Sequence, residues 1–107
     1  MAEFTKRERE QLRRLASQVY EAEVRTLLEE LDSSFAQWRA GAVLGSELLH
    51  TIHEFHQHQS RELWSTYQAL HDPEVVARGL ARGLLLESEV ASDLLARLGP
   101  SVIGFWS

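Results

Sequence analysis

The sequence predicts an all-α fold, a small helical bundle, and two observations lead to this prediction. Structure breakers are scarce, with Pro 2 and Gly 6 among 107 residues. Apolar residues recur at spacings of three and four over long stretches, the period of an amphipathic helix. We expect a long N-terminal helix hairpinned to a second long helix, with two short C-terminal helices. At 12.2 kDa these form a single all-helical domain over residues 1–107.

The composition narrows the classes of function. Cysteine is absent, which excludes disulfides, thiolate metal sites and a cysteine nucleophile. The formal net charge of -5 argues against sequence-independent binding to nucleic acid, which needs a basic surface. No apolar run is long enough to cross a bilayer, and the charged N-terminus is not followed by the apolar segment of a leader. We therefore expect a cytoplasmic protein with neither a nucleic-acid nor a membrane partner.

The first helix is predicted to begin after Thr5, an N-cap residue, and to run without Pro or Gly to Ala40. Such a helix extends about 50 Å, beyond the roughly 30 Å of a small domain, so part of it must bend, overhang or find a partner. Two apolar lines run along it: Leu12, Leu15, Val19 and Ala22, then Tyr20, Val24, Leu27, Leu31, Phe35 and Trp38. We expect the second line to pack within its own chain and the first on a second copy, which gives a homodimer through the first helix.

The second helix is predicted to follow a short connection. Gly41 suits the C′ position that ends the first helix, and Gly45 with Ser46 provides a turn and an N-cap. The helix then covers residues 47–70, and its apolar positions form one stripe: Leu48, Ile52, Phe55, Leu63 and Leu70.

Two shorter helices complete the prediction. Asp72 is a suitable N-cap and Pro73 a suitable first residue for a helix over residues 73–82. Gly79 and Gly83 offer two roles, close helix approach and helix termination, which the sequence does not assign between them.

The fourth helix is expected to begin at Glu87 or Ser88 and to stop at Gly99 and Pro100. The apolar tail, residues 101–107, is expected to dock on the core or on a partner, because free tails are rarely so apolar.

A candidate metal site lies on one polar face of the second helix, formed by Glu47, His50, His53 and Glu54. Glu47 and His50 have the Glu-x-x-His spacing that di-iron bundles use. That motif occurs only once, so a site needs a dimer to double it, with Glu21, Glu29 or Glu30 as further carboxylates. The alternative is a hydrated polar face. We expect no cofactor, with a divalent metal at these four residues as the alternative.

The other histidines have simpler interpretations. His56 falls inside the apolar stripe, where a histidine is typically a hydrogen-bonded core residue. His58 lies one helical turn from Glu54 and from Glu62, a spacing that supports the helix. No catalytic triad pattern or phosphate-binding loop is present. We therefore expect no catalytic residues and no enzyme.

One block of the second helix carries a family resemblance. It consists of residues 52–56, Ile-His-Glu-Phe-His, followed by residues 60–64, Ser-Arg-Glu-Leu-Trp. With these motifs the chain resembles a set of small bacterial all-helical proteins that have no assigned activity. That pattern often has Gly near position 58, where this chain has His58, so a helix break implied there is not expected here. The resemblance implies no substrate, cofactor or partner, and suggests a structural or binding block that includes His53, His56, Arg61 and Trp64.

These observations favour a non-enzymatic, dimeric protein–protein interaction module. It would bind through the first helix or through the flank of the second helix. The competing hypothesis is a metal- or small-ligand-binding protein that uses the Glu/His face described above.

Overall fold

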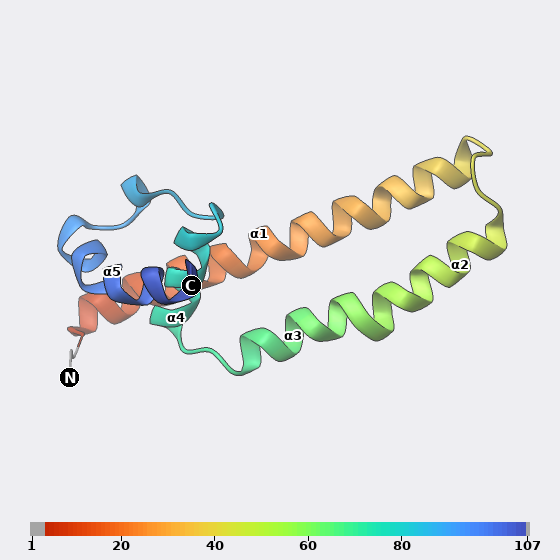
Figure 1. Ribbon diagram of the computed structural model, residues 1–107. Coiled ribbons are helices and arrows are strands. Elements are labelled where there is room, and N and C mark those ends of the chain that lie inside the picture. The colour runs from red at the N-terminus through yellow and green to blue at the C-terminus, as the bar shows by residue number, and fades with distance from the viewer. Residues whose placement is uncertain (1–3, 107) are drawn as a thin grey trace. The chain divides into compact units, whose positions relative to one another are not determined.

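The computed structural model describes the backbone of residues 4–106 and the side chains of residues 4–99 (Figure 1). Its elements in order are α1 (Lys6–Arg39), α2 (Gly45–Glu54), the π-helical turn η1 (Phe55–Gln59), α3 (Ser60–Gln68), α4 (Asp72–Ala81), the 3-10 turn η2 (Glu87–Glu89) and α5 (Ser92–Trp106). No strand occurs in residues 4–106. The predicted all-α fold is confirmed.

The chain divides into two compact units, which are described separately. One consists of Met1–Ala22 with Leu70–Ser107 and is called the core unit here. The other is Glu23–Ala69 and is called the hairpin. Helix α1 contributes its first half to the core unit and its second half to the hairpin. The single domain over residues 1–107 stays a prediction.

Both predicted ends of α1 are confirmed. The Thr5 hydroxyl accepts a bond from the Glu8 N–H at 3.1 Å, and the Glu8 carboxylate accepts one from the Thr5 N–H at 2.8 Å, which is a capping box. At the other end Gly41 has φ +79°, a conformation that suits glycine. The Ala42 N–H bonds to the Gln37 carbonyl at 2.9 Å and closes the helix.

The core unit holds nearly all the buried apolar side chains that the structure describes. They come from three helices and the connection before α5: Leu12, Leu15, Ala16, Val19, Val75, Val76, Ala77, Leu85, Val90, Leu94 and Leu98. Apolar burial is the main stabilising term in folding, so this unit carries most of the stability.

One expectation is wrong in the core unit. The line of Leu12, Leu15 and Val19 was expected to face a second copy, yet these residues are buried within their own chain. The physical reason is that α4 and α5 supply the apolar surface that the line needs. A homodimer stays a prediction, and it would have to use another part of α1.

Gly79 and Gly83 have one of the two proposed roles each. Gly83, at φ +73°, follows the helix, and the Leu84 N–H bonds to the Gly79 carbonyl at 2.8 Å. Gly79 is buried inside α4, and a Cβ added there would lie 3.0 Å from Cγ1 of Val19 and 3.2 Å from its Cβ. Gly79 therefore permits the close approach of α4 to α1.

The helix α4 begins at Asp72, and His71 is its N-cap, one residue before the expected cap. The reason is local: the His71 N–H donates a bond of 3.0 Å to the Glu74 carboxylate, which is the backbone half of a capping box.

Polar contacts fix η2 and α5 to α1. The Arg97 guanidinium donates to both Glu8 carboxylate oxygens at 2.8 and 2.9 Å, and it lies 4.4 Å from the centre of the Phe4 ring. The Gln18 amide donates to Glu89 at 2.8 Å. The Thr5 backbone N–H, and after it Arg97, lower the pKa of Glu8.

The last helix differs from the prediction at both ends. It begins at Ser92, after the separate turn η2, and it continues through Gly99 and Pro100 to Trp106. Gly99 is not among the glycines with positive φ, so it does not form a terminating C′ turn. Proline removes one backbone hydrogen bond without ending the helix. The predicted docking of the tail lies outside the described side chains.

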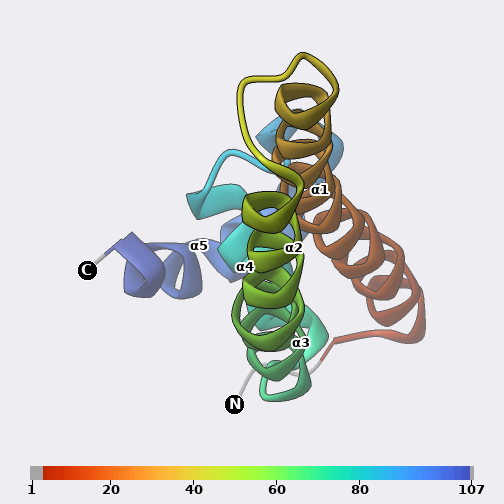
Figure 2. The same ribbon diagram turned by 90° about the vertical axis from the view of Figure 1, so that its right-hand side faces the viewer.

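The hairpin pairs the second half of α1 with α2, η1 and α3, which follow one another in nearly one line (Figures 1 and 2). Helix α2 begins at Gly45 with Leu44 as N-cap, so the expected Ser46 cap is wrong. The extended backbone of Leu44, at φ -76° and ψ 154°, already permits the helix to start there. Leu48 is the one apolar residue that is buried among the described residues of the hairpin.

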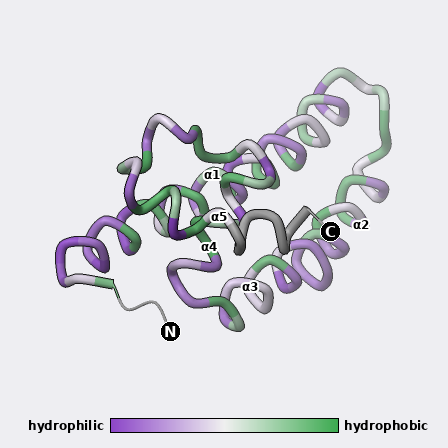
Figure 3. The backbone as a smooth tube through the Cα atoms, turned by 60° about the vertical axis from the view of Figure 1, so that its left-hand side comes forward, coloured by the Kyte–Doolittle hydropathy of each residue, from purple (hydrophilic) through white to green (hydrophobic). Residues whose placement is uncertain are grey.

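Hydrophobic and hydrophilic residues are interspersed along the helices (Figure 3). Among the described residues, no helix is both long enough and apolar enough to cross a membrane.

Candidate functional site: a groove at the π-helical turn

The second helical stretch of the hairpin is interrupted by a wide turn over Phe55–Gln59. The Ser60 N–H bonds to the Phe55 carbonyl, five residues back, where an α-helix bonds four residues back. The turn thus holds one residue more than an α-helical turn. The second long helix expected over residues 47–70 is therefore present, and one of its turns is wider than an α-helical turn.

His56 was expected to be buried in the apolar stripe. His56 is exposed, and so is Gln59. Leu49, which lies within about 20° of His56 around the axis, is exposed ahead of the wide turn, so this side of the helix is uncovered because the hairpin has no third layer in its own unit. A core role for His56 is therefore wrong.

A surface groove lies along this turn and the start of α3. Its lining residues are His56, Gln57, Ser60, Arg61 and Trp64. None of them is a carboxylate. They offer a guanidinium, a hydroxyl, an amide and an imidazole beside an indole ring that is exposed. Polar groups beside an apolar ring are the combination typical of a binding pocket.

The groove includes three residues of the block that the resemblance suggested: His56, Arg61 and Trp64. Its fourth member, His53, is exposed on α2 and does not line the groove. Sequence reasoning missed Gln57 as a lining residue, and it placed Ser60 in the block without a role. The signal for both would have been the i, i+4 spacing of positions 56, 60 and 64 and of positions 57 and 61, which places them on one face of a helix.

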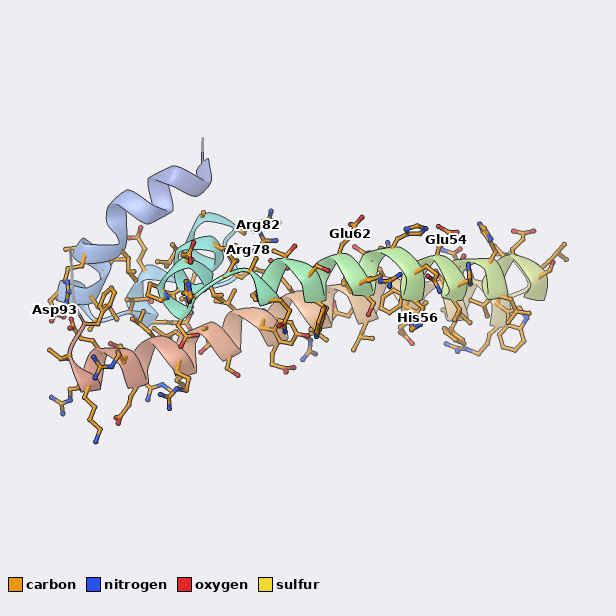
Figure 4. All side chains as sticks on the ribbon, turned by 90° about the horizontal axis from the view of Figure 1, so that it is seen from below. Glu54, His56, Glu62, Arg78, Arg82 and Asp93 are labelled. Carbon is orange, nitrogen blue, oxygen red and sulfur yellow. The ribbon has the colours of Figure 1, made fainter. Side chains whose placement is uncertain are left out.

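The opposite edge of the same helix carries Glu54 and two histidines in contact with it. A Glu54 oxygen lies 3.2 Å from Nε2 of His58, and the other lies 4.0 Å from Nε2 of His50. Figure 4 shows the Glu54 and Glu62 side chains on one edge and His56 on the other. The predicted pairing of Glu54 with His58 is confirmed.

The four residues of the candidate metal site do not converge. Glu47, His50 and His53 are exposed, and Glu54 contacts His58, which was not part of the set. Within the described residues, no group of three or more His, Asp or Glu side chains is placed to hold a metal ion. Metal binding by Glu47, His50, His53 and Glu54 stays a prediction that would need more than one chain.

A second hollow lies in the core unit, between α1 and the start of α5. Its rim is charged with both signs, by Arg7, Glu10, Arg14 and Asp93. Mixed charge of this kind favours no single class of ligand.

Exposed apolar side chains mark the hairpin further. Large apolar residues that are exposed within the described part of the chain are Leu28, Trp38, Leu44, Leu49, Trp64 and Leu86. All of these except Leu86 belong to the hairpin. Among residues 4–99, the hairpin therefore has fewer buried apolar side chains than the core unit and five of the six large apolar side chains that are exposed.

Comparisons with known proteins find no match among protein-family models, curated proteins or solved structures. The resemblance to small bacterial proteins stays an interpretation of residues 52–64.

Proposed function

We propose that the protein is a non-enzymatic helical interaction module that acts as a homodimer, with the hairpin as its binding element. One observation carries the proposal: the hairpin buries Leu48 alone among its described apolar residues, while Leu28, Trp38, Leu44, Leu49 and Trp64 are exposed. Isolated exposed leucines are ordinary on a protein surface. Several large apolar side chains on one two-helix unit are typical of an interaction site.

The geometry of a hairpin explains why a partner is needed. Each of two paired helices covers only one side of the other, so an apolar stripe wider than that contact remains partly in water. The apolar residues that face between the helices, such as Leu27, Leu31 and Phe55, are only half-buried. A second hairpin would complete a four-helix arrangement, in which such residues become core.

The observations favour this proposal over its alternatives. A metal site at Glu47, His50, His53 and Glu54 would need ligands from another chain, so it would presuppose the dimer. The groove places polar groups beside an apolar ring, which supports binding. The cytoplasmic location expected from the sequence belongs to the proposal as well.

Sedimentation or light scattering over a range of micromolar concentrations tests the proposal. We expect the chain to run as a dimer, and Leu49→Glu to shift it to a monomer because the charge would be buried at the interface. Leu86→Glu is the matched control, since Leu86 is 64% exposed and Leu49 69%, but Leu86 lies in the core unit. A wild-type chain that stays monomeric throughout, or a dimer indifferent to Leu49→Glu, would contradict the proposal.

A further inference from the structure

The hairpin has two sides of different chemistry. At about 100° per residue, carboxylates from both helical arms of the hairpin fall on one side of it. We call this side the acidic face, and it consists of Glu23, Glu30, Glu47, Glu54 and Glu62. The contacts of Glu54 with His50 and His58 belong to this side, and Figure 4 shows Glu54 and Glu62 together on it.

The other side carries the groove and the exposed apolar residues of the helices. On α2 and α3, Leu49, His56, Ser60 and Trp64 follow one line once the wide turn is included. On α1, Leu28 lies about 80° around the helix from the middle of the half-buried stripe. Because the two helical arms of the hairpin are antiparallel, that rotation places Leu28 on the same side as the groove. We call this side the groove face.

Leu28 and the groove also lie at the same level along the hairpin. Leu28 and His56 are equally far in sequence from Ala42 in the connecting loop, so an antiparallel pairing places them level with each other. One surface thus presents a projecting leucine on α1 next to a recess on η1 and α3. Leu28 is 52% exposed, so its side chain is available to a partner.

We infer that two copies pack groove face against groove face, and that Leu28 of each copy inserts into the groove of the other. The inference rests on the proposed homodimer and specifies its interface. In a two-fold interface, residue i of one copy meets residue j of the other and the reverse. A surface with both a knob and a hole can therefore pair with itself, as in helical bundles.

Charge favours a second copy on this side. The arginines of the hairpin, Arg25, Arg39 and Arg61, lie on or beside the groove face. Asp32 and Glu29 lie there too, and Glu29 pairs with Arg25 at 3.0 Å, so the charges on this face nearly balance. The carboxylates of the acidic face point the other way, so two chains of formal net charge -5 can approach through the side where repulsion is weakest. Pairing through the acidic face would instead oppose ten glutamates across one interface.

Single cysteines test the inference cleanly, because the natural chain has none. Ser60→Cys places a thiol in the groove, and Ser65→Cys places one on the outward side of the same helix. Both serines are exposed in the single chain. Maleimide labelling is followed at concentrations below and above that at which sedimentation shows the dimer. We expect the Ser60→Cys thiol to react severalfold more slowly in the dimer and the Ser65→Cys thiol to react equally in both states.

A second variant tests the knob. Leu28→Asp should dissociate the dimer and restore fast labelling of Ser60→Cys at all concentrations, while its circular dichroism spectrum stays helical. A dimer in which the Ser60→Cys thiol remains fully reactive, or which tolerates Leu28→Asp, would overturn this interface and leave the homodimer standing. A wild-type monomer at every concentration would overturn both proposals. If Ser60→Cys alone dissociates the dimer and Ser65→Cys does not, the groove is still assigned to the interface.

Discussion

Replacing Gly79 by alanine adds one methyl group at the closest contact between α4 and α1. Its carbon would lie 3.0 Å from Cγ1 and 3.2 Å from Cβ of Val19, and closer still to Cγ2. Val19 is completely buried and β-branched, so it has little freedom to turn away. Overpacking a dense core costs about 1–3 kcal/mol. Alanine is favoured over glycine in a helix by about 0.5–1 kcal/mol, which offsets part of that cost.

We therefore expect Gly79→Ala to lower the free energy of unfolding by about 1 kcal/mol, and by at most about 2.5 kcal/mol, the difference between these two effects. Chemical denaturation followed by far-UV circular dichroism at one fixed protein concentration measures it, since dimerisation would otherwise contribute. Gly45→Ala is the control: the added Cβ would lie 3.6 Å from Nε1 of Trp38, an ordinary contact, and we expect a change within about 0.5 kcal/mol.

The double variant with Val19→Ala tests whether contact with Val19 is the cause of the destabilisation. Val19→Ala removes the two methyl groups that the new side chain meets most closely and leaves only the Cβ, 3.2 Å away, so Gly79→Ala should cost clearly less in that background than in the natural chain. If Gly79→Ala costs the same with and without Val19→Ala, or stabilises the natural chain, the close approach is not what requires glycine at this position.

Two further predictions concern charge and metal. Because hydrogen bonds from the Thr5 N–H and from Arg97 lower the pKa of Glu8 below its usual 4.5, the ionised form stabilises the fold at higher pH, and this contribution is lost as the pH falls below 4.5 through the folded-state pKa. Glu8→Gln should flatten the pH dependence of thermal stability in that range, whereas Glu10→Gln should not, and equal slopes in all three proteins would contradict the assignment. Elemental analysis of purified protein should find no stoichiometric iron, zinc or manganese; a metal that is lost in His50→Ala and His53→Ala would restore the Glu/His site as the leading function.

Features set by local hydrogen bonding could be predicted from the sequence. Thr5 and Gly41 mark the ends of α1 because a capping box and a left-handed C′ residue depend on a few neighbouring residues. Features set by distant contacts could not. The stripe of Leu12 and Val19 shows that one side of α1 is apolar, but the pattern does not say which helix covers it. Gly79 likewise has a defined role only once Val19 is known to lie against it.

Most residues of the candidate site could be predicted from the sequence, but the geometry of the helix that carries them could not. The resemblance drew attention to His56, Arg61 and Trp64, and the structure brings them together in one groove. A helical wheel placed His56 in the core because the apolar stripe was taken as too wide: Leu49, at nearly the same angle, is exposed as well. The wheel also assumes that every turn has the same width, so it missed the wide turn. No residue in Phe55–Gln59 is a glycine or proline that would signal a change.

The wide turn has a packing reason that connects the hairpin to its groove. Phe55 and Leu63 are both half-buried, yet eight residues of α-helix would leave them about 80° apart around the axis. A turn that holds one additional residue removes most of this angle and returns Leu63 to the line of Phe55. The same rotation brings Ser60 and Trp64 onto the line of His56, and these three residues line the groove. The half-buried stripe and the groove therefore depend on the same turn, so a change that restored a regular helix would rotate Leu63 by about 80° away from the line of Phe55.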